Sequence, residues 1–146
     1  MTGPPLILDA DGLDALTEQP PPERLRALLA EAWERRSDVL LPALVCAECC
    51  RGAARTRAVE ASLARHRENR AIRPAVRVVP TDFELARRVG AVLHGAGAST
   101  ADIVDAHSVA VASLQGRAVV VTSDPDDIRR LASAVPTVRI VTRPAR

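Results

Sequence analysis

The stretch Leu6-Ile7-Leu8-Asp9 is a short apolar run that ends in a carboxylate. Apolar runs of this length, bounded by polar residues, indicate strands that are buried on both faces. Four later segments share this character, at residues 39–41, 76–79, 118–122 and 138–141. The sequence therefore predicts a set of short buried strands.

Helical patterns separate the predicted strands. The clearest pattern covers residues 23–36, where five side chains follow the i, i+3, i+4, i+7, i+8 spacing and are expected to face the core: Leu25, Leu28, Leu29, Ala32 and Trp33. Further helices are predicted at residues 42–51, 53–69, 82–94 and 101–115, and a last one begins at Pro125. Strands that alternate with helices predict a mostly parallel sheet with helices on both sides, because parallel neighbours need crossover connections.

Length and composition limit the possible classes of protein. A chain of 146 residues is the size of one domain, so residues 1–146 are expected to form a single domain. The net charge of +2 is too small to indicate nucleic-acid binding by itself. The start of the chain does not resemble a signal peptide, and no apolar stretch approaches the roughly 20 residues that span a bilayer. We expect a soluble, cytoplasmic protein without a membrane segment.

Three cysteines, Cys46, Cys49 and Cys50, lie within five residues of one another. An odd, clustered set is unlike the disulfide framework of a secreted protein and is compatible with reduced thiols. Cys46 and Cys49 form a C-x-x-C pair, but no second pair or nearby histidine completes a zinc site. Buried structural thiols are the favoured interpretation, with metal ligation as the alternative.

Two aspartates follow predicted strands at the edge where parallel sheets form their sites. Asp9 comes directly after the first strand, and Asp124 follows the strand at 118–122 after one residue. The structural alternative for Asp9 is a turn residue or helix cap. For Asp124 that alternative is stronger, because Asp124-Pro125-Asp126-Asp127 is typical of a helix N-terminus.

Glu48 and Asp105 lie inside predicted helices. Glu48 is three residues from Val45 and is expected on the same apolar stripe, where a charge must be paired, protonated or bound to a metal. A salt bridge to an arginine is the alternative. Asp105 has no evident structural role, whereas Asp102, three residues after Ser99, resembles the acid of a capping box. We therefore prefer Asp105 as a ligand and Asp102 as a cap.

These acids can converge on one edge of the sheet. Carboxylates that lie close together repel one another unless a divalent cation neutralises them, and oxygen ligands without histidine favour Mg²⁺ or Mn²⁺. Such ions can activate water and stabilise displacement at a phosphodiester. His107 is expected to pack or lie at the surface, and not to act as a general base.

The sequence resembles the PIN-domain family, and particularly the VapC-like ribonuclease toxins of VapBC toxin–antitoxin pairs. The resemblance covers nearly the whole chain and rests on four fragments: residues 8–10, Ala47-Glu48 followed by Arg51-Gly52, residues 104–106 with Ala110, and residues 121–124 with Asp127. Together, the order and spacing of these fragments are fairly specific.

The resemblance implies a three-layer α/β/α sandwich with a five-stranded, mostly parallel sheet. It also implies an Mg²⁺- or Mn²⁺-dependent endoribonuclease that cleaves RNA, is inhibited by a cognate antitoxin and forms a homodimer. The family's acids match Asp9, Glu48, Asp105 and Asp124 as catalytic residues and metal ligands, with Asp127 as an accessory ligand and Thr122 and Ser123 as groups that position water or phosphate. Asp11 departs from the small or hydroxyl residue often found there, so it could add a ligand or disturb the site.

An arginine-rich region begins after Glu48. Arg51, Arg55 and Arg57 are candidates for contacting an RNA backbone, within a longer run of arginines that extends to Arg77. A solvated helical face, or a surface for an acidic partner, is an equal alternative. Two other functions remain open: a catalytically idle PIN-like module that binds RNA or protein, and a metal-dependent DNA nuclease or phosphatase.

Overall fold

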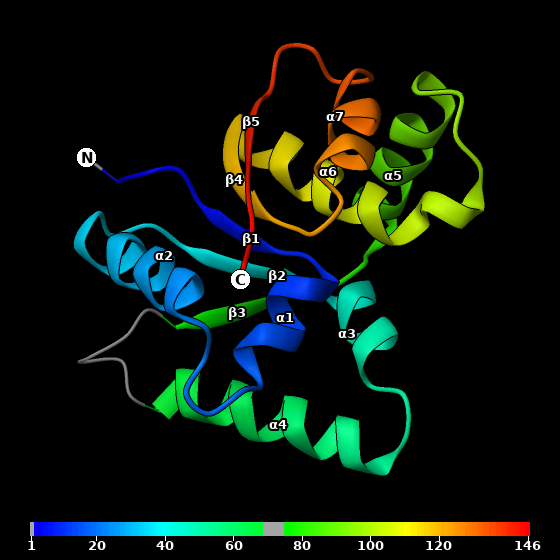
Figure 1. The fold of residues 1–146 in the computed structure, drawn as a ribbon. Helices are drawn as coiled ribbons and strands as arrows, with labels where there is room; N and C mark the ends of the chain where they lie inside the picture. The colour runs from blue at the N-terminus through cyan, green and yellow to red at the C-terminus, as the bar shows by residue number, and fades with distance from the viewer. Residues whose placement is uncertain (1, 69–74) are drawn as a thin grey trace.

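The computed structural model describes residues 2–68 and 75–146, which form a parallel sheet between two layers of helices (Figure 1). The sheet has five strands in the order β3-β2-β1-β4-β5, and every pairing is parallel. The strands are β1 (Leu6–Leu8), β2 (Val39–Pro42), β3 (Val76–Val79), β4 (Arg117–Val121) and β5 (Arg139–Arg143). The predicted α/β/α class with a five-stranded parallel sheet is confirmed.

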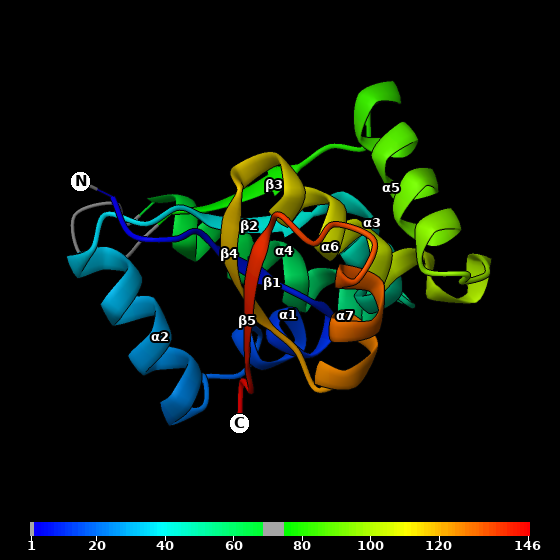
Figure 2. The same ribbon diagram turned by 90° about the horizontal axis from the view of Figure 1, so that it is seen from above.

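Successive side chains along a strand face two separate cores on opposite sides of the sheet, as the pleat of a β-strand requires. Leu6 and Leu8 face one core, whereas Ile7 between them faces the other. The first core is covered by α1 (Ala10–Leu16), α2 (Glu23–Glu34), α3 (Ala43–Cys49) and α4 (Ala53–Glu68). The second core is covered by α5 (Phe83–Gly95), α6 (Ile103–Gln115) and α7 (Pro125–Ala132), and Figure 2 shows the two layers from above.

Local sequence signals set several of the helix ends. The Asp82 carboxylate accepts a hydrogen bond of 2.8 Å from the backbone N–H of Leu85 and caps α5. Pro125 occupies the first position of α7, where its missing N–H costs nothing. Gly116 ends α6 at φ 79°, a left-handed conformation that glycine adopts without strain.

The structure corrects three expectations about the helices. The helix α1 was not expected, because its seven residues contain Gly12 and two aspartates. A short 3₁₀ helix, η1 (Thr100–Asp102), precedes α6, so the predicted helix at 101–115 begins at Ile103 instead. Trp33 is 43% exposed, whereas Leu25, Leu29 and Ala32 are buried, so the buried stripe of α2 is narrower than predicted. Residue 69, the expected end of α4, lies outside the described residues.

The strand order places a topological switch point between β1 and β4. The chain moves outward from β1 through β2 to β3, and then returns to the other side of β1 as β4 and β5. The carboxyl ends of strands at such a point open into a crevice, because the following helices leave toward opposite faces. Asp9 and Thr122 directly follow β1 and β4 at this point. Within the two described ranges, no helix is long and apolar enough to cross a membrane.

Candidate metal centre

Asp9 is a buried carboxylate that two hydroxyl groups hold in place. Its side chain is 4% exposed, although it directly follows β1 at the start of α1. Thr122 donates a hydrogen bond of 3.0 Å from Oγ1 to Asp9 Oδ2, and Ser108 Oγ lies 3.5 Å from Asp9 Oδ1. Asp9 occupies the N-cap position of α1 but makes no side-chain cap hydrogen bond. The carboxylate therefore faces β4 and α6, and not the end of its own helix.

Thr122 connects two of the predicted acids. The same Oγ1 that donates to Asp9 accepts a hydrogen bond of 3.0 Å from the backbone N–H of Asp124. The Thr122 side chain is buried. Its hydroxyl therefore fixes Asp9 and the backbone of Asp124, while the positioning of water or phosphate by Thr122 and Ser123 stays a prediction. Ser123 is exposed.

Three further carboxylates gather beside Asp9. One oxygen from each of Asp105, Asp124 and Asp127 lies within 4.8 Å of the others. Asp105 is in the first turn of α6, while Asp124 and Asp127 lie at and just inside the start of α7. Asp124 occupies the N-cap position of α7 without a side-chain cap hydrogen bond, so the capping alternative does not account for its carboxylate.

The electrostatics of Asp105 show how unfavourable this gathering is without a cation. Burial, followed by the charge and hydrogen bond of Asp9 and the charges of Asp124 and Asp127, raises the pKa of Asp105 to about 8. Near neutral pH the protein relieves the repulsion by keeping a proton on Asp105. A hard divalent cation would relieve it more effectively, because it offers two positive charges to ligands that are all oxygens. The residues present thus fit Mg²⁺ or Mn²⁺.

The prediction that Glu48 is buried is wrong. Val45 is buried on α3, but Glu48 is exposed, because the apolar stripe of this short helix is too narrow to include it. Among the described residues, Glu48 is not part of the group whose oxygens lie within 4.8 Å of one another. The helix α3 nevertheless packs against α1 and α6, which carry or follow the acids at this edge.

Asp102 does not complete the predicted capping box. Ser99 caps η1 by accepting a hydrogen bond of 3.2 Å from Ala101 N–H, but Asp102 makes no side-chain cap hydrogen bond. Instead, Asp102 Oδ1 accepts a hydrogen bond of 2.9 Å from Arg130, whose guanidinium also lies 3.5 Å from Asp127. Arg130 thus connects α7 to η1 directly beside the acidic group.

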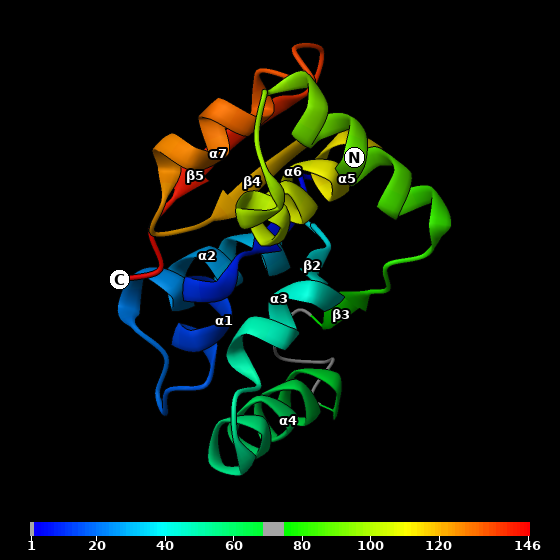
Figure 3. The same ribbon diagram turned by 90° about the vertical axis from the view of Figure 1, so that its right-hand side faces the viewer.

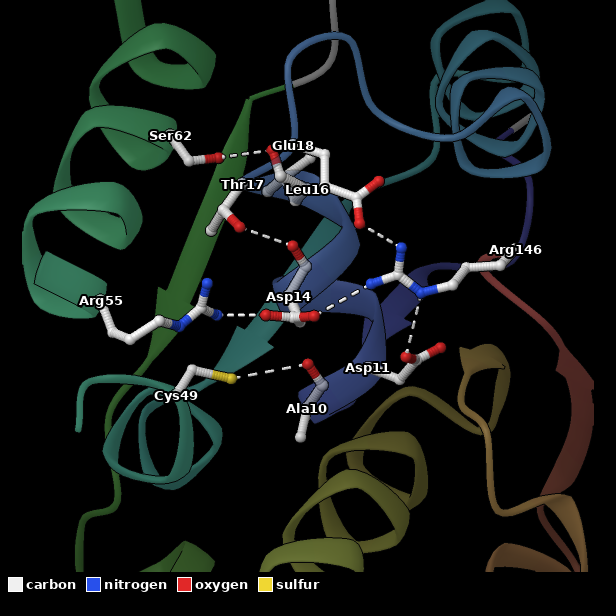
Figure 4. A network of polar contacts seen from close by, with 10 residues as sticks. All are labelled: Ala10, Asp11, Asp14, Leu16, Thr17, Glu18, Cys49, Arg55, Ser62 and Arg146. Atoms are coloured by element: carbon white, nitrogen blue, oxygen red, sulfur yellow. Dashed lines mark hydrogen bonds and ion pairs between the residues drawn. The ribbon is translucent and has the colours of Figure 1, made fainter.

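Asp11 belongs to a network of ion pairs on the outer side of α1 (Figure 4). Arg146 Nε lies 3.5 Å from Asp11 Oδ1, and the same guanidinium contacts Asp14 at 2.9 Å and also pairs with Glu18. Arg55 of α4 pairs with Asp14 from the opposite side. Asp11 is therefore held by Arg146 and is not among the clustered oxygens, within the range searched.

The three arginines predicted to contact RNA differ in their exposure, and so do the three cysteines. Arg51 and Arg57 are exposed, whereas Arg55 is half-buried and paired with Asp14. Of the three cysteines predicted to be buried, Cys49 is buried, whereas Cys46 and Cys50 are only half-buried. The Cys49 thiol lies 3.5 Å from the carbonyl oxygen of Ala10, and burial is the main reason that its pKa rises to about 11. A thiol with this pKa stays protonated and inert at neutral pH.

His107 is buried, as one of the two expected placements had it. Its Nδ1 lies 2.7 Å from the carbonyl oxygen of Ile103, so that nitrogen carries the proton and donates.

Ser108, a contact of Asp9, was not predicted from sequence. Its position three residues after Asp105, on the same face of α6, was the available signal.

Comparisons with known proteins identify the family. The PIN-domain profile matches residues 13–134 of the chain. The chain belongs to the PIN-domain family. The match begins just after Asp9, and the VapC-like resemblance seen in the sequence is consistent with it. The fold is similar to that of a chain in the structure of FitAB bound to the IR36 DNA fragment, with a TM-score of 0.57, 19% identity, and 94% of each chain covered. Among curated proteins, none matches the sequence.

PIN domains are generally metal-dependent nucleases, and the acidic group lies where such a fold forms its site. Asp9 follows β1, Asp105 lies on α6, and Asp124 and Asp127 lie at the start of α7. These elements meet at the switch point between β1 and β4. Both the family and the donor chemistry therefore support a divalent-metal nuclease.

Proposed function

We propose that this PIN-domain chain is an endoribonuclease that requires Mg²⁺ or Mn²⁺ and cleaves phosphodiester bonds of RNA. The observation that carries the proposal is the group formed by Asp105, Asp124 and Asp127, with the buried Asp9 held beside it. Four carboxylates that lie together at a switch point repel one another and so destabilise the folded protein. A bound catalytic cation would neutralise this repulsion and would explain why the acids lie together.

Asp9, Asp105, Asp124 and Asp127 are the residues that would hold the metal. We add Glu48 as a more distant ligand or water-positioning group, because α3 packs against both α1 and α6. A bound divalent ion supplies a Lewis acid that lowers the pKa of water and stabilises charge on a phosphoryl oxygen.

The chain's own residues prepare the site for the ion. Asp105 carries a proton near neutral pH, and it would lose this proton to act as a ligand of a divalent ion. Thr122 holds the carboxylate of Asp9 and the backbone of Asp124 through one hydroxyl, and groups of this kind orient the ligands of metal sites. Arg51 and Arg57, exposed near α3 and along α4, are the proposed contacts for the RNA backbone. Their contribution should weaken as salt rises.

We further propose that the chain is the cytoplasmic toxin of a type II toxin–antitoxin pair and works as a homodimer. The VapC-like resemblance supports the toxin role, and the FitAB structure, which includes a DNA fragment, supports looking for a partner that binds DNA. Co-expression with the product of an adjacent short reading frame, followed by size-exclusion chromatography, would test the partner. A free toxin that neither binds that product nor is inhibited by it would contradict this part.

The nuclease proposal is tested with purified full-length protein on single-stranded RNA and DNA of the same sequence. Each substrate is incubated with Mg²⁺, with Mn²⁺ and with chelator. We expect internal RNA cleavage with either metal, no cleavage in chelator, and losses of about 100-fold or more in Asp9→Asn and Asp105→Asn. Asp126→Asn is the matched control, because its fully exposed side chain lies on the same helix as Asp127.

Several outcomes would contradict the proposal. RNA cleavage that survives in chelator, or in both active-site variants, would show that the acids do not hold a catalytic metal. Cleavage of DNA in preference to RNA would assign the site to a DNA nuclease. An intact metal site without cleavage of either substrate would favour the idle module.

A further inference from the structure

A cavity lies on the α5–α6–α7 side of the sheet, away from the acidic group. It has a volume of about 350 Å³ and lies between α5, the C-terminal end of α6 and the segment that connects α7 to β5. Its lining includes Arg87 and Arg88 of α5 and Ser113 of α6. Ser113 follows Asp105 by more than two helical turns, about 12 Å along α6. Figure 3 shows α5, α6 and α7 from the side, with the connection to β5 beside them.

The charged side chains that line this cavity are all positive. Its described lining residues include two arginines and no aspartate or glutamate. The nearest acid to the two guanidinium groups is Glu84, at 3.8 Å from Arg87 and 3.5 Å from Arg88. Glu84 is well exposed, and ion pairs of this length at the surface contribute little. The two positive charges are therefore largely available to a ligand.

Arg88 also carries a donor that the protein does not use. Its Nε is buried and has no hydrogen-bond partner in the described part of the chain. A buried donor without a partner is unfavourable, and a guanidinium is most strongly satisfied by a planar pair of anionic oxygens. An anion that drew the Arg88 head group into the cavity would supply the partner that Nε lacks. Phosphate suits the fixed fork of the guanidinium particularly well.

The rest of the lining indicates what the anion is attached to. Val135, Pro136 and Val138 contribute apolar side chains to the lining beside the two arginines, together with the hydroxyl group of Thr137. A cavity of this volume is large enough for a small organic ligand. Apolar side chains and a hydroxyl group next to two guanidiniums fit a phosphate that carries a planar ring with apolar faces and polar edges, as a nucleotide does.

We propose that this cavity binds the phosphate group of a nucleotide, either free or within an RNA strand. The site is independent of the metal centre, because it uses other residues and needs no cation. If the source is RNA, the cavity would grip the strand at a distance from the acids. If the source is a free nucleotide, the cavity is a separate ligand site on the same domain.

The test is isothermal titration calorimetry on the full chain in chelator, which removes any binding through a metal. The probes are inorganic phosphate, adenosine monophosphate, adenosine and a short single-stranded RNA. Arg88→Gln removes the guanidinium, and Ala91→Glu places a negative charge on the lining at an exposed position of α5. Arg129→Gln is the control, since this exposed arginine of α7 does not line the cavity. Thermal unfolding verifies that each variant is folded.

We expect adenosine monophosphate to bind the unmodified protein and Arg129→Gln alike, and to bind Arg88→Gln and Ala91→Glu about tenfold more weakly or worse. An effect of both variants on RNA but not on the mononucleotide would assign the phosphate to the strand. Equal binding of adenosine, affinities unchanged in Arg88→Gln and Ala91→Glu, or no saturable binding of any phosphate probe would overturn the proposal. None of these results depends on whether the acids cleave RNA.

Discussion

Thr122 is the residue through which two of the acids are held at fixed positions. Its hydroxyl donates to Asp9 and accepts from the backbone of Asp124, and the side chain is buried. Groups that orient ligands are often as important to a metal site as the ligands themselves. Thr122 therefore controls the geometry without needing to touch a metal.

Replacing Thr122 tests this role. Thr122→Val keeps the shape but leaves Asp9 without its closest hydroxyl partner, so we expect a loss of about 1–3 kcal/mol in the free energy of unfolding and about tenfold weaker metal binding. Thr122→Ser keeps the hydroxyl and should retain most of both properties. Urea unfolding and metal titration measure the two effects. Equal behaviour of the two variants would show that the hydroxyl is unimportant.

Asp105 makes the metal-free protein sensitive to pH. Its pKa is raised to about 8 in the folded state, whereas an unfolded aspartate has a pKa near 3.9. Between these values the folded protein keeps a proton that the unfolded chain has lost. Stability of the metal-free protein should therefore fall as the pH rises from about 4 to about 8.

Asp105→Asn removes this titration. At pH 8 in chelator we expect the variant to be more stable than the unmodified protein by about 1 kcal/mol, a value discounted because the group is only half buried. At pH 4 the difference should be close to zero. Thermal unfolding at the two pH values measures this change. A variant that is less stable at pH 8 would show that the acids do not repel one another.

Some of these site residues could be predicted from their own positions in the sequence. Asp105 stood out because no cap or turn accounted for it, and the structure places it among the acids. Glu48 was expected to be buried because Val45 is, but one turn of a short helix does not define the width of its apolar stripe. The link from Thr122 to Asp9 joins residues 113 positions apart, and only the tertiary fold reveals it.

At the scale of elements, α1 is the helix that the sequence did not predict. Its seven residues have weak intrinsic preference for a helix, since they include Gly12 and two aspartates. Tertiary contacts stabilise it instead: Leu13 and Leu16 are fully buried, and a Cβ at Gly12 would lie 3.2 Å from Val121. Helices this short depend on such contacts more than on propensity.

The ion pairs of Asp14 should contribute to holding α1. Asp14 pairs with Arg55 of α4 and with Arg146 (Figure 4). These two ion pairs connect α1 to α4 and to the segment after β5. We expect Asp14→Asn to reduce the free energy of unfolding by about 0.5–1 kcal/mol, because each pair is partly exposed. Glu31→Gln, which breaks an exposed i, i+4 pair with Arg35, should cost less. Urea unfolding at low and high salt compares them, and equal costs would contradict the assignment.

At the scale of the whole molecule, the sheet topology brings the acids together. The order β3-β2-β1-β4-β5 sets the ends of β1 and β4 side by side, although more than 100 residues separate them in the chain. Alternating strands and helices predicted the parallel sheet, and the apolar runs predicted where its strands lie. The strand order could not be read from the pattern, because similar buried runs can pair in several orders.

The central claim is that these carboxylates bind a divalent cation, and Mn²⁺ binding followed by electron paramagnetic resonance tests it most directly. The signal of free Mn²⁺ should fall on addition of the unmodified protein at pH 8, and Mg²⁺ should compete for the same site. Asp105→Asn and Asp124→Asn should lose most of this binding, whereas Asp126→Asn should retain it. Mn²⁺ binding that is absent from the unmodified protein, or unchanged in Asp105→Asn and Asp124→Asn, would contradict the account.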